Sequence, residues 1–104
     1  MFVARWNIDA RFGHKQSAIE LMRKWEREIG PQAGTDDMDI KVLTGSIGAK
    51  EAAIEVNHSV ETLAQLEAFF GKLGKIDAHA KWGKDLEPLV VSGSSYWNIY
   101  RVVE

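Results

Sequence analysis

The sequence contains no cysteine, only two prolines among its 104 residues, and no long apolar run. Without cysteine the chain has no disulfide, no thiolate zinc site and no cysteine nucleophile. No stretch approaches the roughly 18 apolar residues of a membrane-spanning helix, and the first residues lack a basic segment followed by an apolar run. We therefore expect a cytoplasmic protein that does not bind a membrane.

The sequence also lacks any block of like charge. Thirteen Lys and Arg stand against fifteen Asp and Glu, for a net charge of −2, and the two signs are interspersed. Domains that bind nucleic acid cluster their basic residues, so no nucleic-acid partner is expected. The three histidines lack the i, i+4 spacing of a helical metal pair, so no protein-bound metal is expected either.

The chain does have an ordinary fraction of apolar residues, 45%, and its sequence contains no linker-like segment and no internal repeat. A chain of this length buries on the order of two-thirds of its unfolded surface, which is enough for one core. We therefore predict a single domain over residues 1–104.

The first half of the chain switches between two periodicities. Residues 2–9 alternate apolar and polar side chains, which predicts a strand. Residues 14–29 repeat apolar side chains at helical spacing, and Gly30-Pro31 then ends the predicted helix, because proline cannot continue the helical hydrogen bonding. Residues 38–43 alternate again and predict a second strand.

The second half begins with a short turn at residues 48–50, which predicts a hairpin into an antiparallel third strand over residues 52–56. Ser59 has the side chain of an N-cap and would begin a helix over residues 60–73. A second short helix is predicted over residues 76–87.

An aromatic, β-branched strand over residues 96–103 completes the order β-α-β-β-α(α)-β. This order is typical of the ferredoxin-like α+β fold, an antiparallel four-stranded sheet with helices on one face. The apolar series that start at Phe2, Met38 and Ala52 suit the helix side. The opposite face is mixed rather than polar, and a second copy of the chain could cover it through a two-fold interface. We therefore predict a homodimer.

Several of these features together resemble one known group of proteins. They are the strand that starts near residue 1, the helix after Gly13-His14-Lys15, the hairpin 40–56, and the segments 79–82, 86–89 and 97–100. With them the chain resembles the dimeric α/β-barrel superfamily, which includes antibiotic-biosynthesis-monooxygenase-like and stress-responsive barrel proteins. The resemblance implies that two sheets face each other across a dimer and close into a barrel with the helices outside.

Activities in that superfamily include cofactor-free oxygenation of aromatic polyketides, haem degradation, and isomerase or dehalogenase-type reactions. The haem-degrading branch carries an Asn on the first strand and a His late in the helical segment, which Asn7 and His79 match. An imidazole can ligate iron and an amide can hydrogen-bond an iron-bound oxygen. Phe69 or Phe70 stands where that branch has a Trp. If the Phe2 series faces the helices, strand parity turns Asn7 away from them, although the sequence leaves the face of Asn7 open. Haem is therefore only the third hypothesis.

A second constellation is polar and would lie on strands beside the barrel interior. It consists of Arg5, Asn7, Glu55, Asn57, Asn98, Tyr100 and Arg101. An oxygenase of the polyketide type would use Asn, Trp, Tyr and Arg to hold and deprotonate a phenolic substrate. The structural alternative is that Arg5 and Glu55 form a cross-strand or inter-subunit ion pair, and we favour it.

We take His79, Asn7 and Arg5 as the candidate catalytic residues. The candidate ligand-binding residues are the aromatic side chains Phe69, Phe70, Trp82, Trp97 and Tyr100. Trp25 stands at helical core spacing and is interpreted as a packing residue.

The first functional hypothesis is a small homodimeric protein that binds or oxidises a small aromatic or apolar molecule without a metal or cofactor, as a monooxygenase-like enzyme would. The alternative is a non-catalytic homodimeric stress-response or interaction module whose interior is filled by aromatic side chains. An open cavity of several hundred Å³ that contains Arg5 or His79 would favour the first hypothesis, and a filled interior the second.

Overall fold

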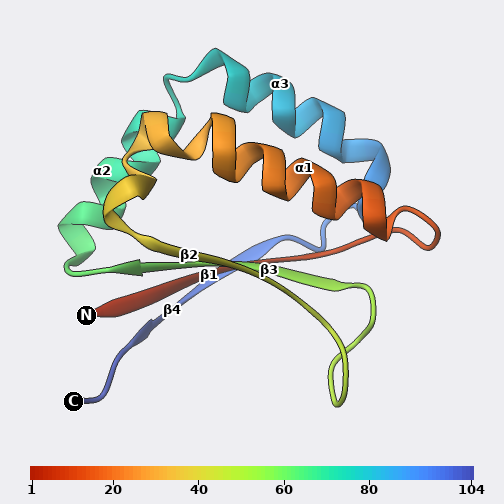
Figure 1. The fold of residues 1–104 in the computed structure, drawn as a ribbon, viewed down its shortest axis with the longest axis horizontal. Helices are drawn as coiled ribbons and strands as arrows, with labels where there is room; N and C mark the ends of the chain where they lie inside the picture. Colours follow the sequence, from red (N-terminus) through yellow and green to blue (C-terminus); the bar gives the residue numbers. More distant parts are fainter.

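The computed structural model describes residues 1–104 and shows four strands and three helices in the order β-α-β-β-α-α-β (Figure 1). The strands are β1 (Phe2–Asp9), β2 (Asp39–Thr44), β3 (Ala53–Val60) and β4 (Tyr96–Arg101). The helices are α1 (Lys15–Glu28), α2 (Leu63–Leu73) and α3 (Asp77–Leu86). The predicted element order and fold class are confirmed, although the last strand ends at Arg101 rather than at residue 103.

The strands form one antiparallel sheet in the order β2-β3-β1-β4. In the register of the sheet, Trp6 of β1 lies opposite Val56 of β3 and Trp97 of β4. Successive side chains on a strand point to opposite faces, so these three residues share one face. All three helices cover that face, and the other face of the sheet is left open (Figure 1).

The hydrophobic core fills the layer between the sheet and the helices. Its largest fully buried side chains are Phe69, Met22, Ile54 and Val60. They come from α2, α1 and β3, so burial of apolar surface, the main driving force of folding, ties the helices to the sheet. None of the helices is both long enough and apolar enough to cross a membrane.

The end of α1 follows the sequence prediction, but the segment after it is more regular than a loop. Gly30 begins a short 3-10 turn, Gly30–Ala33, with Pro31 in its first positions. A Cβ at Gly30 would lie 2.8 Å from Thr35 Oγ1 and 3.1 Å from the Trp25 ring, so only glycine fits there. The backbone at Gly30 therefore lies close to the ring of Trp25, which lines the pocket described below.

The start of α2 corrects the sequence prediction. Ser59 is not an N-cap, because β3 continues to Val60 and Ser59 pairs with Val3 and Asp39 in the sheet. The N-cap is Thr62, whose Oγ1 accepts a hydrogen bond from the Gln65 backbone N–H at 3.1 Å. Both residues have a capping hydroxyl, so residue type alone could not separate them, whereas the buried alternation along β3 could.

Candidate functional site

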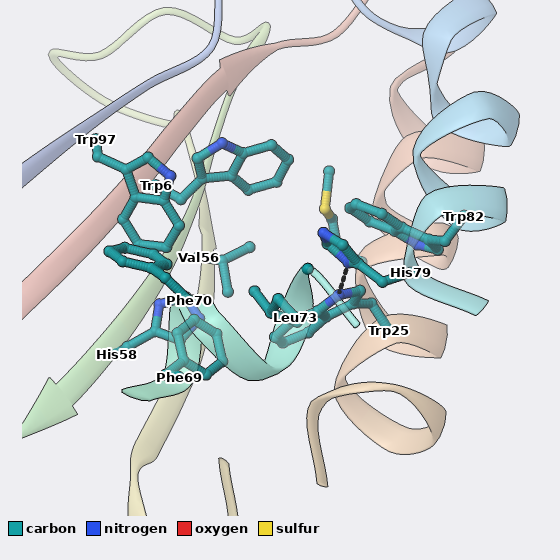
Figure 2. Close-up of a pocket in the computed structure, with 12 residues that line it drawn as sticks. Trp6, Trp25, Val56, His58, Phe69, Phe70, Leu73, His79, Trp82 and Trp97 are labelled. Atoms are coloured by element: carbon teal, nitrogen blue, oxygen red, sulfur yellow. Dashed lines mark hydrogen bonds between the residues drawn. The ribbon is translucent and has the colours of Figure 1, made fainter. Parts of the chain in front are cut away.

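A cavity of about 370 Å³ lies between the covered face of the sheet and the helices (Figure 2). Its size falls within the range of small-molecule sites. Nine of its twelve lining residues are hydrophobic, and all four tryptophans of the chain are among them. The lining residues are Trp6, Met22, Trp25, Val56, His58, Phe69, Phe70, Leu73, Gly74, His79, Trp82 and Trp97. We call this cavity the aromatic pocket.

Trp25 of α1 lines the pocket and contacts four other rings of its lining. Its ring centroid is 6.1 Å from that of Phe69 and 6.3 Å from that of Trp82. The rings of His58 and His79 meet it in edge-on geometry, at 6.0 and 6.3 Å. Such tilted and edge-to-face contacts are the favoured arrangements of aromatic rings, and together they fix the orientation of the Trp25 indole.

The His79 ring of α3 is held from two sides. The Nε1–H of Trp25 donates a hydrogen bond to Nδ1 of His79 at 3.0 Å, the dashed line in Figure 2. The imidazole also stacks on Trp82 with a centroid distance of 5.8 Å and an interplanar angle of 16°. Trp82 is itself anchored, because its Nε1–H donates to the Leu21 carbonyl at 2.7 Å. The pocket therefore presents His79 in one fixed orientation.

The protonation state of His79 follows from these contacts. Desolvation by burial lowers the pKa of His79, so the ring is neutral near neutral pH. A neutral imidazole has one N–H and one acceptor nitrogen, and here the acceptor is Nδ1, which receives the Trp25 hydrogen bond. The proton of His79 is therefore on Nε2.

His58 of β3 is the second imidazole of the pocket and is only 2% exposed. Its ring lies 5.2 Å from that of Phe69 and 5.4 Å from that of Trp97. Its Nδ1 is 3.4 Å from the Ala4 carbonyl oxygen, which can only accept, so Nδ1 carries the proton. Burial lowers the pKa of His58 to about 4, and the ring is neutral near neutral pH.

The chemistry that this lining allows is limited and specific. None of the twelve lining residues is Lys, Arg, Asp or Glu. Both imidazoles are neutral and, with lowered pKa values, weak bases. The pocket can therefore surround an apolar ring and offer it neutral hydrogen bonds, but it has no charged group with which to hold an ion.

The structure divides the eight predicted site residues between the two faces of the sheet. Five of them line the aromatic pocket: His79, Phe69, Phe70, Trp82 and Trp97. The other three, Arg5, Asn7 and Tyr100, do not line it and lie on the open face. The predicted catalytic group of His79, Asn7 and Arg5 is therefore not brought together.

The open face carries a row of paired polar groups. The Nε–H of Arg5 donates to Glu55 Oε1 at 2.7 Å, and this hydrogen bond raises the pKa of Arg5 above its ordinary value. The guanidinium lies 5.3 Å from the centre of the Tyr100 ring. Beside it, the Nδ2–H of Asn7 donates to Asn98 Oδ1 at 3.2 Å. The Arg5–Glu55 contact is the cross-strand ion pair that the structural alternative predicted.

Two other members of that polar constellation behave differently. Arg101 pairs with Phe2 and therefore lies on the helix side of the sheet, so its predicted place in the group is wrong. Asn57 lies opposite Arg5 on the open face, and its Oδ1 is buried without a hydrogen-bond partner. A buried acceptor without a hydrogen-bond donor is unfavourable for folding, and Asn57 Oδ1 is such an atom.

The two residues predicted to hold haem, His79 and Asn7, do not fit that role. An axial iron ligand must present a nitrogen without a proton, and on His79 that nitrogen is Nδ1, which already receives the Trp25 hydrogen bond. Asn7, the other residue expected near the iron, lies across the sheet. No three His, Asp or Glu side chains are grouped in a way that could hold a metal ion.

Sequence reasoning missed three lining residues that define the pocket. The sequence predicts Trp25 only as a packing residue, and Trp6 belongs to the apolar series that starts at Phe2 and is assigned no functional role. His58 lies just beyond the third strand predicted over residues 52–56 and is therefore not among the candidate site residues. One signal could have found His58, since it occupies a buried position in the alternation with Ile54 and Val56.

Comparison with known proteins relates the chain to others through structure only. No protein-family model matches the sequence, and no curated protein matches it. A solved NIPSNAP family protein from Agrobacterium tumefaciens has 19% identity and a TM-score of 0.80, over 99% of this chain and 86% of that one. A NIPSNAP domain protein from Burkholderia xenovorans has 10% identity and a TM-score of 0.73, over 99% and 95%.

A protein from Deinococcus radiodurans that is named as an antibiotic biosynthesis monooxygenase has 11% identity and a TM-score of 0.71, over 100% of this chain and 94% of that one. At such identities the likeness establishes the fold alone. The ferredoxin-like α+β fold, shared with NIPSNAP and antibiotic-biosynthesis-monooxygenase-like proteins, is therefore confirmed, as the sequence resemblance predicted.

Proposed function

We propose that this chain binds a small, uncharged aromatic or apolar molecule in the aromatic pocket. The observation that carries this proposal is the open cavity of about 370 Å³, lined by nine hydrophobic residues and containing His79. The alternative, a non-catalytic module with a filled interior, predicts that the aromatic side chains occupy this space. Instead, Phe69, Phe70, Trp82 and Trp97 form its walls, which supports ligand binding.

Cofactor-independent oxygenation is the second candidate, because two structural neighbours carry the name of antibiotic biosynthesis monooxygenases. That reaction needs a phenolic substrate to lose its proton. The pocket contains no carboxylate or lysine, and both of its histidines are weak bases. Oxygenation would therefore be confined to substrates that are already acidic, and we place binding before catalysis.

We propose further that the protein acts as a homodimer in which two open sheet faces stack. Tyr96 and Tyr100 of the edge strand β4 are 57% and 51% exposed on this face, and Leu43 of the opposite edge strand β2 is 44% exposed. Exposed apolar groups of this extent favour a partner surface, and a two-fold copy provides one that is complementary to itself.

Binding can be tested with tetralin, an uncharged two-ring hydrocarbon, and proton–nitrogen NMR. Every tryptophan lines the pocket, so each of the four indole N–H signals reports on occupancy. We expect saturable shifts of these signals in the wild-type protein. Val56→Phe, which adds volume at a side chain that is 5% exposed in the pocket floor, should abolish them.

Val91→Phe is the matched control, because Val91 is 44% exposed and does not line the pocket. This variant should bind as the wild-type protein does. Indole signals of the wild-type protein that stay unchanged up to the solubility limit of tetralin, and of the related ketone compared below, would contradict the proposed function.

A further inference from the structure

The hydrogen-bonding groups of the aromatic pocket are not evenly divided between donors and acceptors. Indole rings only donate, and two of the four indole N–H groups already have partners: that of Trp25 binds His79 Nδ1, and that of Trp82 binds the Leu21 carbonyl. The indoles of Trp6 and Trp97, which also line the pocket, form no hydrogen bond within the protein.

His79 adds a further donor, and its direction is set by Trp25. With Nδ1 occupied, the neutral ring carries its proton on Nε2. Figure 2 shows this second nitrogen on the side of the ring that faces away from Trp25. Nε2 has no hydrogen-bond partner in the protein and is not fully buried, so a ligand can reach it.

Acceptors are scarce by comparison. The lining contains no carboxylate, side-chain amide or hydroxyl group. The thioether of Met22 is a weak acceptor, and His58 keeps one acceptor nitrogen on a ring that is 2% exposed. A ligand with an acceptor oxygen can therefore pair with the free N–H groups of the pocket, whereas a ligand that mainly carries donors finds few acceptors there.

We propose that the ligand is an uncharged aromatic ketone whose carbonyl oxygen accepts a hydrogen bond from the Nε2–H of His79, and that Trp25 is the positioning residue that fixes this tautomer. The inference rests on the proposed function, because it names the class of molecule that the same pocket binds. A carboxylate of similar size is excluded, since the lining has no cationic side chain to pair with it.

The experiment compares α-tetralone with tetralin, which has the same ring system but no carbonyl group, by the shifts of the indole N–H signals. We expect the wild-type protein to bind the ketone about tenfold more tightly, the gain of one neutral hydrogen bond in a desolvated site. His79→Phe keeps a ring against Trp82 but has no N–H, so it should bind the two compounds equally. Naphthoate should not bind.

The two ways of failing are distinct. If neither compound shifts the indole signals of the wild-type protein, the proposed function fails and the inference fails with it. If both compounds bind with equal affinity, or if His79→Phe retains the preference, the inference alone is overturned.

A second measurement needs no stable His79 variant. Nitrogen NMR of the wild-type imidazole should show His79 as the Nε2–H tautomer, and Trp25→Phe should shift the ring toward a mixture of tautomers. A merely structural role for Trp25 would leave the tautomer unchanged. A wild-type ring protonated on Nδ1 would overturn the proposal.

Discussion

His58 shows how the register of one strand can place a titratable side chain among aromatic rings. In β3 it occupies the same face as Ile54, Val56 and Val60, which are all buried. The strand therefore carries an imidazole into the layer that the helices cover. Burial is the largest influence on its charge and lowers its pKa, whereas backbone hydrogen bonds at Ala4, 3.4 Å away, and at Val56 act in the opposite direction.

This burial predicts a pH dependence of stability. The unfolded chain binds a proton at His58 with a pKa near 6.5, and the folded chain only near 4. Between these values the unfolded state holds more protons, so the free energy of unfolding falls as the pH is lowered from about 6.5 to about 4. The loss should amount to about 3 kcal/mol, as measured by urea unfolding across this range.

His58→Gln should weaken this pH dependence, because glutamine keeps a hydrogen-bonding side chain but does not titrate. His14→Gln, which replaces an exposed histidine before α1, is the matched control and should behave as the wild-type protein does. An equal pH slope in the wild-type protein and in His58→Gln would contradict the prediction.

At the same scale, sequence could place some residues and not others. Strand parity turns Asn7 away from the helices only if the Phe2 series faces them, which the sequence left open, and the structure places Asn7 on the open face beside Asn98. The hydrogen bond between Trp25 and His79 could not be predicted, because the residues are 54 positions apart and their contact depends on how α1 packs against α3. Periodicity identifies which side of an element is buried but not which side chains meet there.

At the scale of elements, the start of α2 shows where a local signal misleads. Strand β3 ends at Val60 and α2 begins at Leu63, so only a short connection separates two periodicities. Thr62 caps the helix, and the side-chain Oε1 of Gln65 accepts a hydrogen bond from the Glu61 backbone N–H at 2.8 Å. This reciprocal arrangement, similar to a capping box, sets the direction in which α2 leaves the sheet.

Thr62→Ala should therefore lower the free energy of unfolding by about 1 kcal/mol, since it removes the acceptor for the Gln65 N–H. Ser59→Ala is the matched control, because it removes a hydroxyl that caps nothing. Urea unfolding of the two variants should separate them, with Thr62→Ala the less stable. The reverse order would restore Ser59 as the cap and would contradict the structure.

At the scale of the whole molecule, the two faces of the sheet differ in how they are covered: the helices of the same chain cover one face, and the other is exposed. The helix-covered face contains the core and the aromatic pocket, and a single chain completes it. The open face carries the Arg5–Glu55 pair beside exposed aromatic rings. The element order was enough to predict this asymmetry, because three helices on one side of a four-stranded sheet leave the other side bare. The volume of the pocket was not predictable, since it depends on how large side chains pack.

The asymmetry gives the last prediction, which concerns assembly. Sedimentation equilibrium at micromolar concentration should give about twice the chain mass of 11.7 kDa. Tyr96 is 57% exposed on the open face, and Tyr96→Glu would place like charges on both halves of a two-fold interface and so produce a monomer. Phe12→Glu, at a fully exposed position outside the sheet, is the control and should remain a dimer. A wild-type protein that sediments as a monomer would contradict the proposed homodimer. It would not bear on ligand binding, because the aromatic pocket is formed within one chain and is tested separately.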